Sequence, residues 1–139
     1  MSRKIDDLQP VVAAMCREFI KRCDEAGIDV IITSTLRTME EQAALYAQGR
    51  TKAGPRVTNA KPGQSWHNWG CAFDYVPIKN GKADWNNIRT FAKCGEIAEA
   101  VGLEWGGRWK MKDYPHCQYT GGNTLAQFQN GTADMSKLV

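Results

Sequence analysis

The segment Ser65-Trp-His67-Asn-Trp-Gly70-Cys-Ala-Phe-Asp74 sets a histidine and a carboxylate seven residues apart, with a glycine between them. From Gly70 to Val76, small or apolar residues alternate with the single carboxylate Asp74, a pattern that predicts a strand. Residues seven apart point to opposite faces of a regular strand, so His67 and Asp74 can meet only if the chain turns between them. We expect that turn at Gly70, because glycine accepts backbone angles that other residues avoid.

Upstream of this segment, the sequence predicts a helix, a strand and a second helix. Residues 5–26 carry apolar side chains at intervals of three and four, the spacing of one helical face. The β-branched run at residues 28–34 predicts a short buried strand. Thr38 and Glu41 form a capping-box pattern, which predicts a helix that runs from there to Gly49.

Downstream, the chain alternates irregular and regular stretches. Residues 50–64 contain prolines, glycines and basic residues without apolar periodicity, which predicts a long surface loop. The apolar spacing of residues 86–101 predicts a helix, residues 103–119 are expected to form two short strands, and a last helix is expected at 124–129. These elements together predict an α+β fold.

Composition bounds the class of protein. A chain of 139 residues and 15.5 kDa has the size of a single domain. With 42% hydrophobic and 24% charged residues it is an ordinary globular sequence, which excludes collagen-like and disordered classes. A net charge of +3 is too small for a dedicated nucleic-acid binder. No apolar run approaches the roughly 20 residues that span a bilayer, and no signal-peptide pattern is visible, so we expect a protein that is made in the cytoplasm and is not membrane-integral.

The cysteines do not indicate a site. There are five, an odd number, and none forms a CxxC pair, which argues against a disulfide framework and against a structural cysteine zinc site. Cys71 and Cys117 lie near the histidines in sequence, but immediate neighbours on an extended chain point to opposite sides. We therefore expect both side chains in the core.

The two histidines carry the strongest chemical signal, because each lies near a carboxylate: His67 near Asp74, and His116 three residues after Asp113. A catalytic zinc ion needs about three imidazole or carboxylate ligands and a base that deprotonates the attacking water. Pro115 forbids a regular helix between Asp113 and His116, so a turn is expected there. The alternative is that both histidines are packed polar residues whose neighbouring carboxylates only satisfy hydrogen bonds.

The order of motifs resembles a known family. The pattern SxHxxGxAxD at residues 65–74 is followed by Glu104-Trp-Gly-Gly-Arg-Trp109 and by Asp113-x-x-His116. This arrangement resembles the zinc D-Ala-D-Ala peptidases, peptidase family M15, which include the VanY and VanX enzymes. Within them it is similar to the phage endolysins that are L-alanyl-D-glutamate endopeptidases. The likeness runs from the segment Ser34-Thr-Leu-Arg37-Thr to about residue 130.

The resemblance implies a fold of the hedgehog and D-Ala-D-Ala-peptidase type, with a small antiparallel sheet flanked by helices. The catalytic domain would span residues 1–139, with a motif core at about 34–119 and no separate cell-wall-binding domain. It also implies one zinc ion bound by His67, Asp74 and His116.

The resemblance further implies that Asp113 activates the water and that Arg37 reaches into the site, where a guanidinium holds a carboxylate or stabilises an oxyanion. Ser65, Gln42 and Trp109 are expected to bind substrate. For Ser65, a turn-forming role before the next tryptophan is the alternative. Gln42 lies on the helix after Arg37, where it orients that side chain or is simply a solvated helix residue.

Two further features have an ordinary structural explanation. Trp66, Trp69 and Trp105 are expected in the core rather than in a substrate groove. For the basic loop from Arg50 to Lys61, one interpretation is that it attracts an anionic wall polymer. The ordinary interpretation is a solvated flexible loop.

The implied activity is hydrolysis of the peptidoglycan stem peptide at the L-Ala-D-Glu bond during host cell lysis. The enzyme would be a monomer that stays in the host cytoplasm until a holin-type pore gives it access to the wall. The enzymatic alternative is a D-Ala-D-Ala carboxypeptidase or dipeptidase with the same metal site. A non-catalytic, zinc-stabilised wall-binding module is the third possibility, and the presence of Asp113 argues against it.

Overall fold

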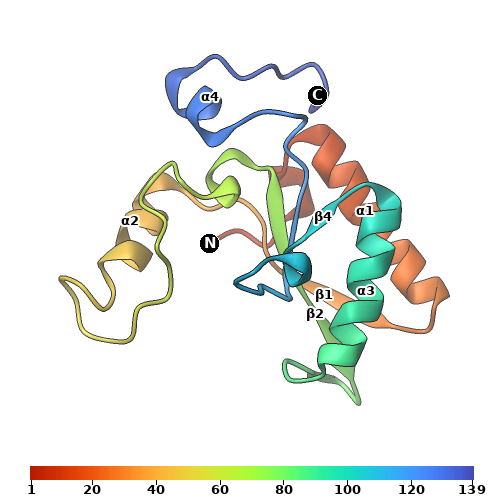
Figure 1. The fold of residues 1–139 in the computed structure, drawn as a ribbon. Coiled ribbons are helices and arrows are strands. Elements are labelled where there is room, and N and C mark those ends of the chain that lie inside the picture. Colours follow the sequence, from red (N-terminus) through yellow and green to blue (C-terminus); the bar gives the residue numbers. More distant parts are fainter.

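The computed structural model describes residues 1–139, and its helices and strands, apart from a two-residue strand at 82–83, occupy the regions that the sequence indicated (Figure 1). In chain order they are α1 Pro10–Glu25, β1 Asp29–Ser34, α2 Met39–Ala47, β2 Ala72–Lys79, β3 Lys82–Ala83, α3 Ile88–Val101, β4 Glu104–Trp105, β5 His116–Gln118 and α4 Leu125–Asn130. Three short 3-10 helices are η1 Ile5–Asp7, η2 Trp66–Trp69 and η3 Gly106–Arg108.

The strands form one antiparallel sheet in the order β1-β2-β5-β4, with the short β3 paired to the end of β2. Helices α1 and α3 lie side by side on one side of this sheet, while α2 and the loop after it lie on the other side of the view in Figure 1. The expected α+β fold with a small antiparallel sheet flanked by helices is confirmed.

The side chains of the sheet alternate between the core and the opposite face. Phe73 and Tyr75 of β2 pack against Phe19 of α1, with ring centroids 5.8 Å and 4.9 Å apart. Since successive residues of a strand point to opposite faces, the intervening Asp74 lies on the face away from α1. Asp74 is paired in register with His116 of β5, so the sheet itself brings these two residues together.

Two sequence predictions are wrong in detail. The first helix does not begin at residue 5, because η1 precedes it and α1 starts at Pro10, where the missing amide N–H of proline is tolerated. The strand at residues 28–34 is not fully buried, because β1 is an edge strand whose Ile31 is 45% exposed. An apolar run indicates a strand but does not tell an edge position from a central one.

Helix α2 begins with the predicted capping box, in which the Glu41 amide donates to Thr38 Oγ1 and the Thr38 amide donates to Glu41 Oε1. Its one buried residue is Gln42, so α2 contributes almost nothing to the apolar core. The predicted loop follows it. There the Arg50 guanidinium lies over the Tyr46 ring, 3.8 Å from its centroid, and donates to the carbonyl oxygen of Thr58, which ties the loop to the helix.

The core is built largely by α1, α3 and the inner face of the sheet. All five cysteines are buried and free, as expected, and Cys71 and Cys117 lie among the core residues. The longest helix, α1, has 16 residues, and none of the helices combines the length and the hydropathy that crossing a membrane would require.

Candidate active site

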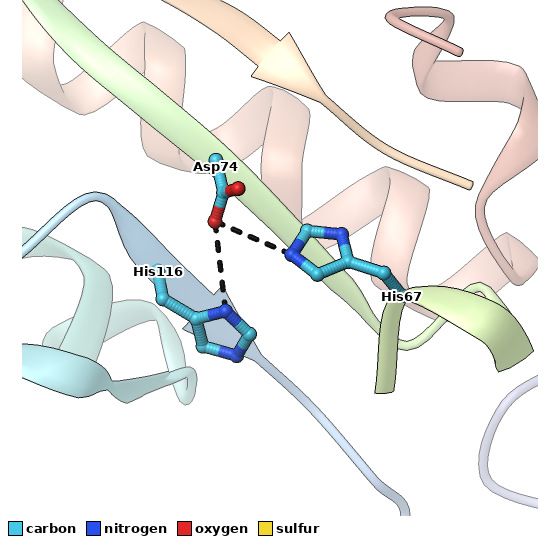
Figure 2. A group of neighbouring side chains, drawn as sticks. All are labelled: His67, Asp74 and His116. Atoms are coloured by element: carbon cyan, nitrogen blue, oxygen red, sulfur yellow. Dashed lines mark ion pairs between the residues drawn. The ribbon is translucent and has the colours of Figure 1, made fainter. Parts of the chain in front are cut away.

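Three side chains from separate parts of the chain converge at one point above the outer face of the sheet (Figure 2). Asp74 Oδ1 lies 3.3 Å from His67 Nε2 and 3.5 Å from His116 Nδ1. One donor atom from each residue lies within 4.8 Å of the others. Both histidines are buried, whereas the Asp74 side chain is 24% exposed, so the cluster opens to solvent on the side of the carboxylate.

His67 reaches the cluster because the chain turns between it and Asp74, as predicted. The residue lies in η2, which Ser65 caps by accepting a hydrogen bond from the His67 amide at 3.3 Å. The helix ends at Gly70, which has a φ of 70° in the left-handed region that glycine tolerates best. Strand β2 starts two residues later, so His67 and Asp74 belong to different elements and are free to face one another.

The orientation of the His67 ring is fixed from behind. Its Nδ1 lies 2.9 Å from the carbonyl oxygen of Thr35, which is buried in the segment between β1 and α2. A carbonyl only accepts, so Nδ1 carries the hydrogen and the lone pair is on Nε2, the atom that faces Asp74. This is the arrangement of a metal-binding histidine whose other nitrogen is held by a carbonyl.

His116 is oriented in the same manner through its other nitrogen. Its Nε2 lies 2.8 Å from Gln118 Oε1, and Nδ1 faces Asp74. The Tyr75 amide donates to the carbonyl of Pro115, and the His116 amide donates to the carbonyl of Asp113 at 3.2 Å, which is the expected turn. The ring of Trp109 packs against His116, with centroids 5.0 Å apart.

These donors fit a divalent metal of the zinc type. Two imidazole nitrogens and one carboxylate oxygen, each with its lone pair directed inward, are the ligand set of a catalytic zinc site with an open position. Burial opposes ionisation of Asp74, but the hydrogen bonds that His116 and His67 donate when their rings are protonated outweigh it and hold the pKa of this carboxyl far below its usual value. The carboxylate is therefore charged at neutral pH, as a metal ligand must be.

Asp113 lies beside the cluster without being part of it. Its Oδ2 is 3.9 Å from His116 Nδ1, and half of its side chain is exposed. Gly106 makes this position possible, because its carbonyl accepts from the Asp113 amide and a Cβ at Gly106 would lie 2.4 Å from the Asp113 carbonyl oxygen. Burial raises the pKa of Asp113, with His116 acting in the opposite direction, which suits a carboxylate that takes up a proton.

Arg37 approaches the same site from the segment between β1 and α2. Its Nη1 donates to Gln42 Oε1 at 2.9 Å, and Gln42 Nε2 donates to the carbonyl of Ala60 at 2.8 Å. The Nε atom of Arg37 is buried without a hydrogen-bond partner. Burial lowers the pKa of Arg37 while Asp74, Glu41 and Asp113 raise it, and the guanidinium keeps its charge at any physiological pH.

The cluster, Asp113 and Arg37 share one pocket of about 340 Å³. Its wall opposite the sheet is formed by α2 and its loop, through Leu45, Val57 and Thr58. Ser65 lines the pocket, whereas Gln42 and Trp109 do not and contact it through Arg37 and His116 instead. Substrate binding by Ser65, Gln42 and Trp109 stays a prediction, although the predicted orientation of Arg37 by Gln42 is present.

Trp66, Trp69 and Trp105 are packing residues, as expected. Trp66 and Trp69 pack on Phe128 of α4, with centroids 5.7 Å and 5.3 Å away, and Trp105 is buried in the core with its indole N–H donating to the carbonyl of Tyr114.

Sequence reasoning did not find the residues that hold the two histidine rings from behind. Thr35 acts through a backbone carbonyl, which leaves no signal in the side-chain pattern. Gln118 could have been found, because it lies two residues after His116 on a predicted strand and therefore on the same face. The Glu104 carboxylate accepts from Gln118 Nε2 at 3.1 Å. This contact could not be predicted without knowledge of the β4–β5 register.

Comparison with known proteins agrees with this geometry. The sequence profile of the family described as D-alanyl-D-alanine carboxypeptidase matches residues 58–119, which contain all three cluster residues. The peptidoglycan L-alanyl-D-glutamate endopeptidase CwlK of Bacillus subtilis is 41% identical over 81% of this chain and 73% of its own length. An L-alanyl-D-glutamate peptidase of a Listeria phage is 31% identical over 83% of this chain, which spans only 39% of the phage protein.

Two solved structures share the fold at lower identity. The L-Ala D-Glu endopeptidase ChiX of Serratia marcescens superposes with a TM-score of 0.65 at 22% identity, over 93% of this chain and 87% of that one. The vancomycin-resistance D,D-pentapeptidase VanY, solved in complex with Zn(II), superposes with a TM-score of 0.63 at 15% identity, over 88% of this chain and 78% of that one. Because it is 41% identical to the Bacillus enzyme over most of both chains, this chain belongs to peptidase family M15, the metallopeptidases of the D-Ala-D-Ala peptidase type.

Proposed function

We propose that this protein is a zinc-dependent peptidoglycan peptidase that hydrolyses the bond between L-alanine and D-glutamate in the stem peptide. The observation that carries the proposal is the convergence of three inward-facing donor atoms with a free carboxylate and a guanidinium in one pocket. The choice of bond is supported by the names of the Bacillus and phage relatives, which are both L-alanyl-D-glutamate peptidases.

The metal site would consist of His67 Nε2, Asp74 Oδ1 and His116 Nδ1, holding one zinc ion. When bound, zinc polarises a carbonyl group and lowers the pKa of a water molecule towards neutrality. The protein contributes a fixed tautomer at each histidine, since Thr35 and Gln118 accept the hydrogens of the other ring nitrogens.

Asp113 would act as the general base and then as the general acid. Its carboxylate is half exposed at the rim of the cluster, where it can take a proton from the attacking water. Its raised pKa lets it hold that proton until the amine of the leaving D-glutamate needs it. The hydrogen bond from its backbone amide to the Gly106 carbonyl fixes the backbone position from which the carboxylate reaches the rim.

Arg37 would stabilise negative charge on the substrate. Its guanidinium lines the pocket, it remains charged, and Gln42 fixes its direction. The developing oxyanion at the scissile carbonyl, or a carboxylate of the acidic stem peptide, would then be met by a donor that is already in place. Ser65, which also lines the pocket, would bind the peptide backbone, and Trp109 would support His116.

The test is mass spectrometry of fragments released from purified peptidoglycan, with and without a chelator. New amino termini at D-glutamate that disappear with chelator would support the proposal. Release of free D-alanine would instead favour a carboxypeptidase. This is the activity named in the description of the family whose profile matches residues 58–119. Binding of the wall without any cleavage by metal-loaded protein would contradict both and favour a wall-binding module.

The matched control is Asp113→Asn, which keeps the size of the side chain but removes its basicity. We expect zinc content to be unchanged and kcat to fall by about 100-fold or more, the usual contribution of a positioned base. Activity close to that of the unaltered protein would contradict the role of Asp113.

We also propose that the biological role is host cell lysis, as an endolysin that reaches the wall through a holin-type pore. The phage relative supports this role, whereas the Bacillus relative carries the same activity in a bacterium. Expression with and without a pore-forming protein separates the two: lysis only with the pore supports an endolysin, and no lysis in either case contradicts it. Ultracentrifugation would test the expected monomer.

A further inference from the structure

A chain of three polar side chains runs from the metal-ligand cluster to the surface across two strands. His116 Nε2 lies 2.8 Å from Gln118 Oε1, and Gln118 Nε2 donates to Glu104 Oε2 at 3.1 Å. His116 and Gln118 are buried, whereas Glu104 is exposed. The register explains the contact, because Glu104 of β4 is paired with Gln118 of β5. His116, two residues before Gln118, lies on the same face of the strand.

The direction of the Gln118 amide decides which nitrogen of His116 carries the hydrogen. A carboxylate only accepts, so Glu104 requires the NH₂ group of Gln118 on its own side. The carbonyl end of the amide then faces His116 and requires a hydrogen on Nε2. The lone pair of the ring is left on Nδ1, the atom that faces Asp74.

Without this constraint, the neighbouring carboxylate would favour the opposite tautomer. Asp74 Oδ1 lies 3.5 Å from His116 Nδ1 and would accept a hydrogen from it. A ring with hydrogen on Nδ1 offers no lone pair to the cluster. A Gln118 amide turned by 180° would stabilise that state by donating to Nε2, so the amide has two self-consistent directions, and only one of them suits a metal.

We propose that Glu104 and Gln118 are positioning residues that hold His116 in the tautomer that binds zinc, with the exposed carboxylate of Glu104 selecting the direction of the buried amide. This inference rests on the proposed zinc site and names two residues that govern its affinity. Glu104 touches neither the metal-ligand cluster nor the pocket and acts only through Gln118.

The sharpest variant is Glu104→Lys. An ammonium group at this exposed position only donates, so it would draw the carbonyl end of Gln118 towards itself and turn the NH₂ group towards His116. We expect zinc affinity to fall by about 10- to 100-fold, the usual effect of losing a partner behind a metal ligand. Glu104→Ala removes the selection without reversing it and should have a smaller effect. The matched control is Glu99→Lys, which changes an exposed carboxylate on α3 that is bound to Arg108.

The double variant Glu104→Lys, Gln118→Glu provides the rescue. The introduced carboxylate accepts from His116 Nε2 in either direction and pairs with the introduced ammonium, so zinc affinity should return to within a few-fold of the unaltered protein. General damage to the sheet edge would not be repaired by a second substitution.

Two readouts are needed: zinc affinity by competition with a chelator, and the His116 tautomer by long-range ¹H–¹⁵N correlation spectra of metal-free protein at a pH where the ring is neutral. We expect hydrogen on Nε2 in the unaltered protein and a shift towards Nδ1 in Glu104→Lys. Unchanged affinity, an unchanged tautomer, or absence of rescue in the double variant would each overturn the inference. If the unaltered protein bound no zinc, the proposed function itself would fail, whereas the tautomer measurement would still test the selection by Glu104.

Discussion

The contact between Gln42 and Arg37 gives the most demanding test of how this site is held, through the substitution Gln42→Leu. Gln42 is fully buried, and its two amide atoms bind Arg37 Nη1 at 2.9 Å and the carbonyl of Ala60 at 2.8 Å. Leucine has a similar volume and no polar atoms, so the substitution leaves both partners without their bond and opens little space.

The expected loss of stability follows from these two bonds. A hydrogen bond to a charged group contributes about 1.5–3 kcal/mol, and a carbonyl left without a donor costs up to about 1–3 kcal/mol, with the lower end expected for the half-buried Ala60. Burial of the apolar leucine side chain offsets part of this lost free energy. We therefore expect the free energy of unfolding to fall by about 2–4 kcal/mol. Gln42 Oε1 is the only oxygen that accepts from the Arg37 guanidinium, so the substitution also releases that side chain. We therefore expect kcat/KM to fall by about 10- to 100-fold, which corresponds to a loss of about 1.4–2.8 kcal/mol of transition-state stabilisation.

The assay combines urea unfolding, zinc content and kcat/KM on a muropeptide. The control is Gln129→Leu, which changes an exposed side chain and removes one hydrogen bond to the Gly63 carbonyl, an acceptor that keeps its bond from the Trp69 indole, and should change stability by less than about 1 kcal/mol. In an Arg37→Ala background, Gln42→Leu should still destabilise the fold but should reduce kcat/KM no further, because the residue through which it acts is gone. A further fall in kcat/KM in that background, or unchanged activity in the single variant, would refute the reasoning.

Three other outcomes are expected. His67→Ala should lose zinc, and equal zinc content by elemental analysis would contradict its role as a ligand. Gly106→Ala should reduce kcat more than it reduces zinc affinity, measured side by side, because the added Cβ would meet the Asp113 carbonyl at 2.4 Å and displace that residue. Zinc affinity should rise with pH, because burial would lower the pKa of His116 but hydrogen bonding to Asp74 raises it, so the proton that zinc must displace persists to higher pH. Chelator competition across a pH series would show a flat profile if this reasoning is wrong.

Much of the fold could be predicted because local signals were strong. The capping box at Thr38 and the periodic apolar residues of α3 gave helices close to their observed bounds. The start of α1 was misplaced because the apolar spacing of residues 5–8 continues the helical pattern, although Pro10 sets the first turn. The exposure of β1 was not predictable, because edge position depends on strand order, which no local pattern records.

The three residues of the cluster could be named from the resemblance, and spacing alone only showed that a turn was needed. That turn at Gly70 is present, and so is the one before His116. The residues behind the ligands were out of reach for a physical reason: the Thr35 carbonyl belongs to the backbone, and the contact between Gln118 and Glu104 depends on register across fourteen residues of sequence.

Two different parts of the fold position the side chains of the site. Asp74 and His116 stand on paired strands of the packed sheet, so their separation is fixed by the core. Arg37 stands on the segment before α2, a helix whose one buried residue is Gln42. The pair of Asp74 and His116 and the Arg37 guanidinium therefore depend on different side-chain contacts, which makes their effects separable. The third residue of the cluster, His67, is held by Thr35 of the same segment as Arg37. Substitutions behind His116 should change zinc affinity and leave the response to Arg37→Ala intact, whereas Gln42→Leu should weaken substrate turnover at full zinc occupancy. If both kinds of substitution lowered zinc affinity alike, the α2 side would be part of the metal site, and the division argued from burial would be wrong.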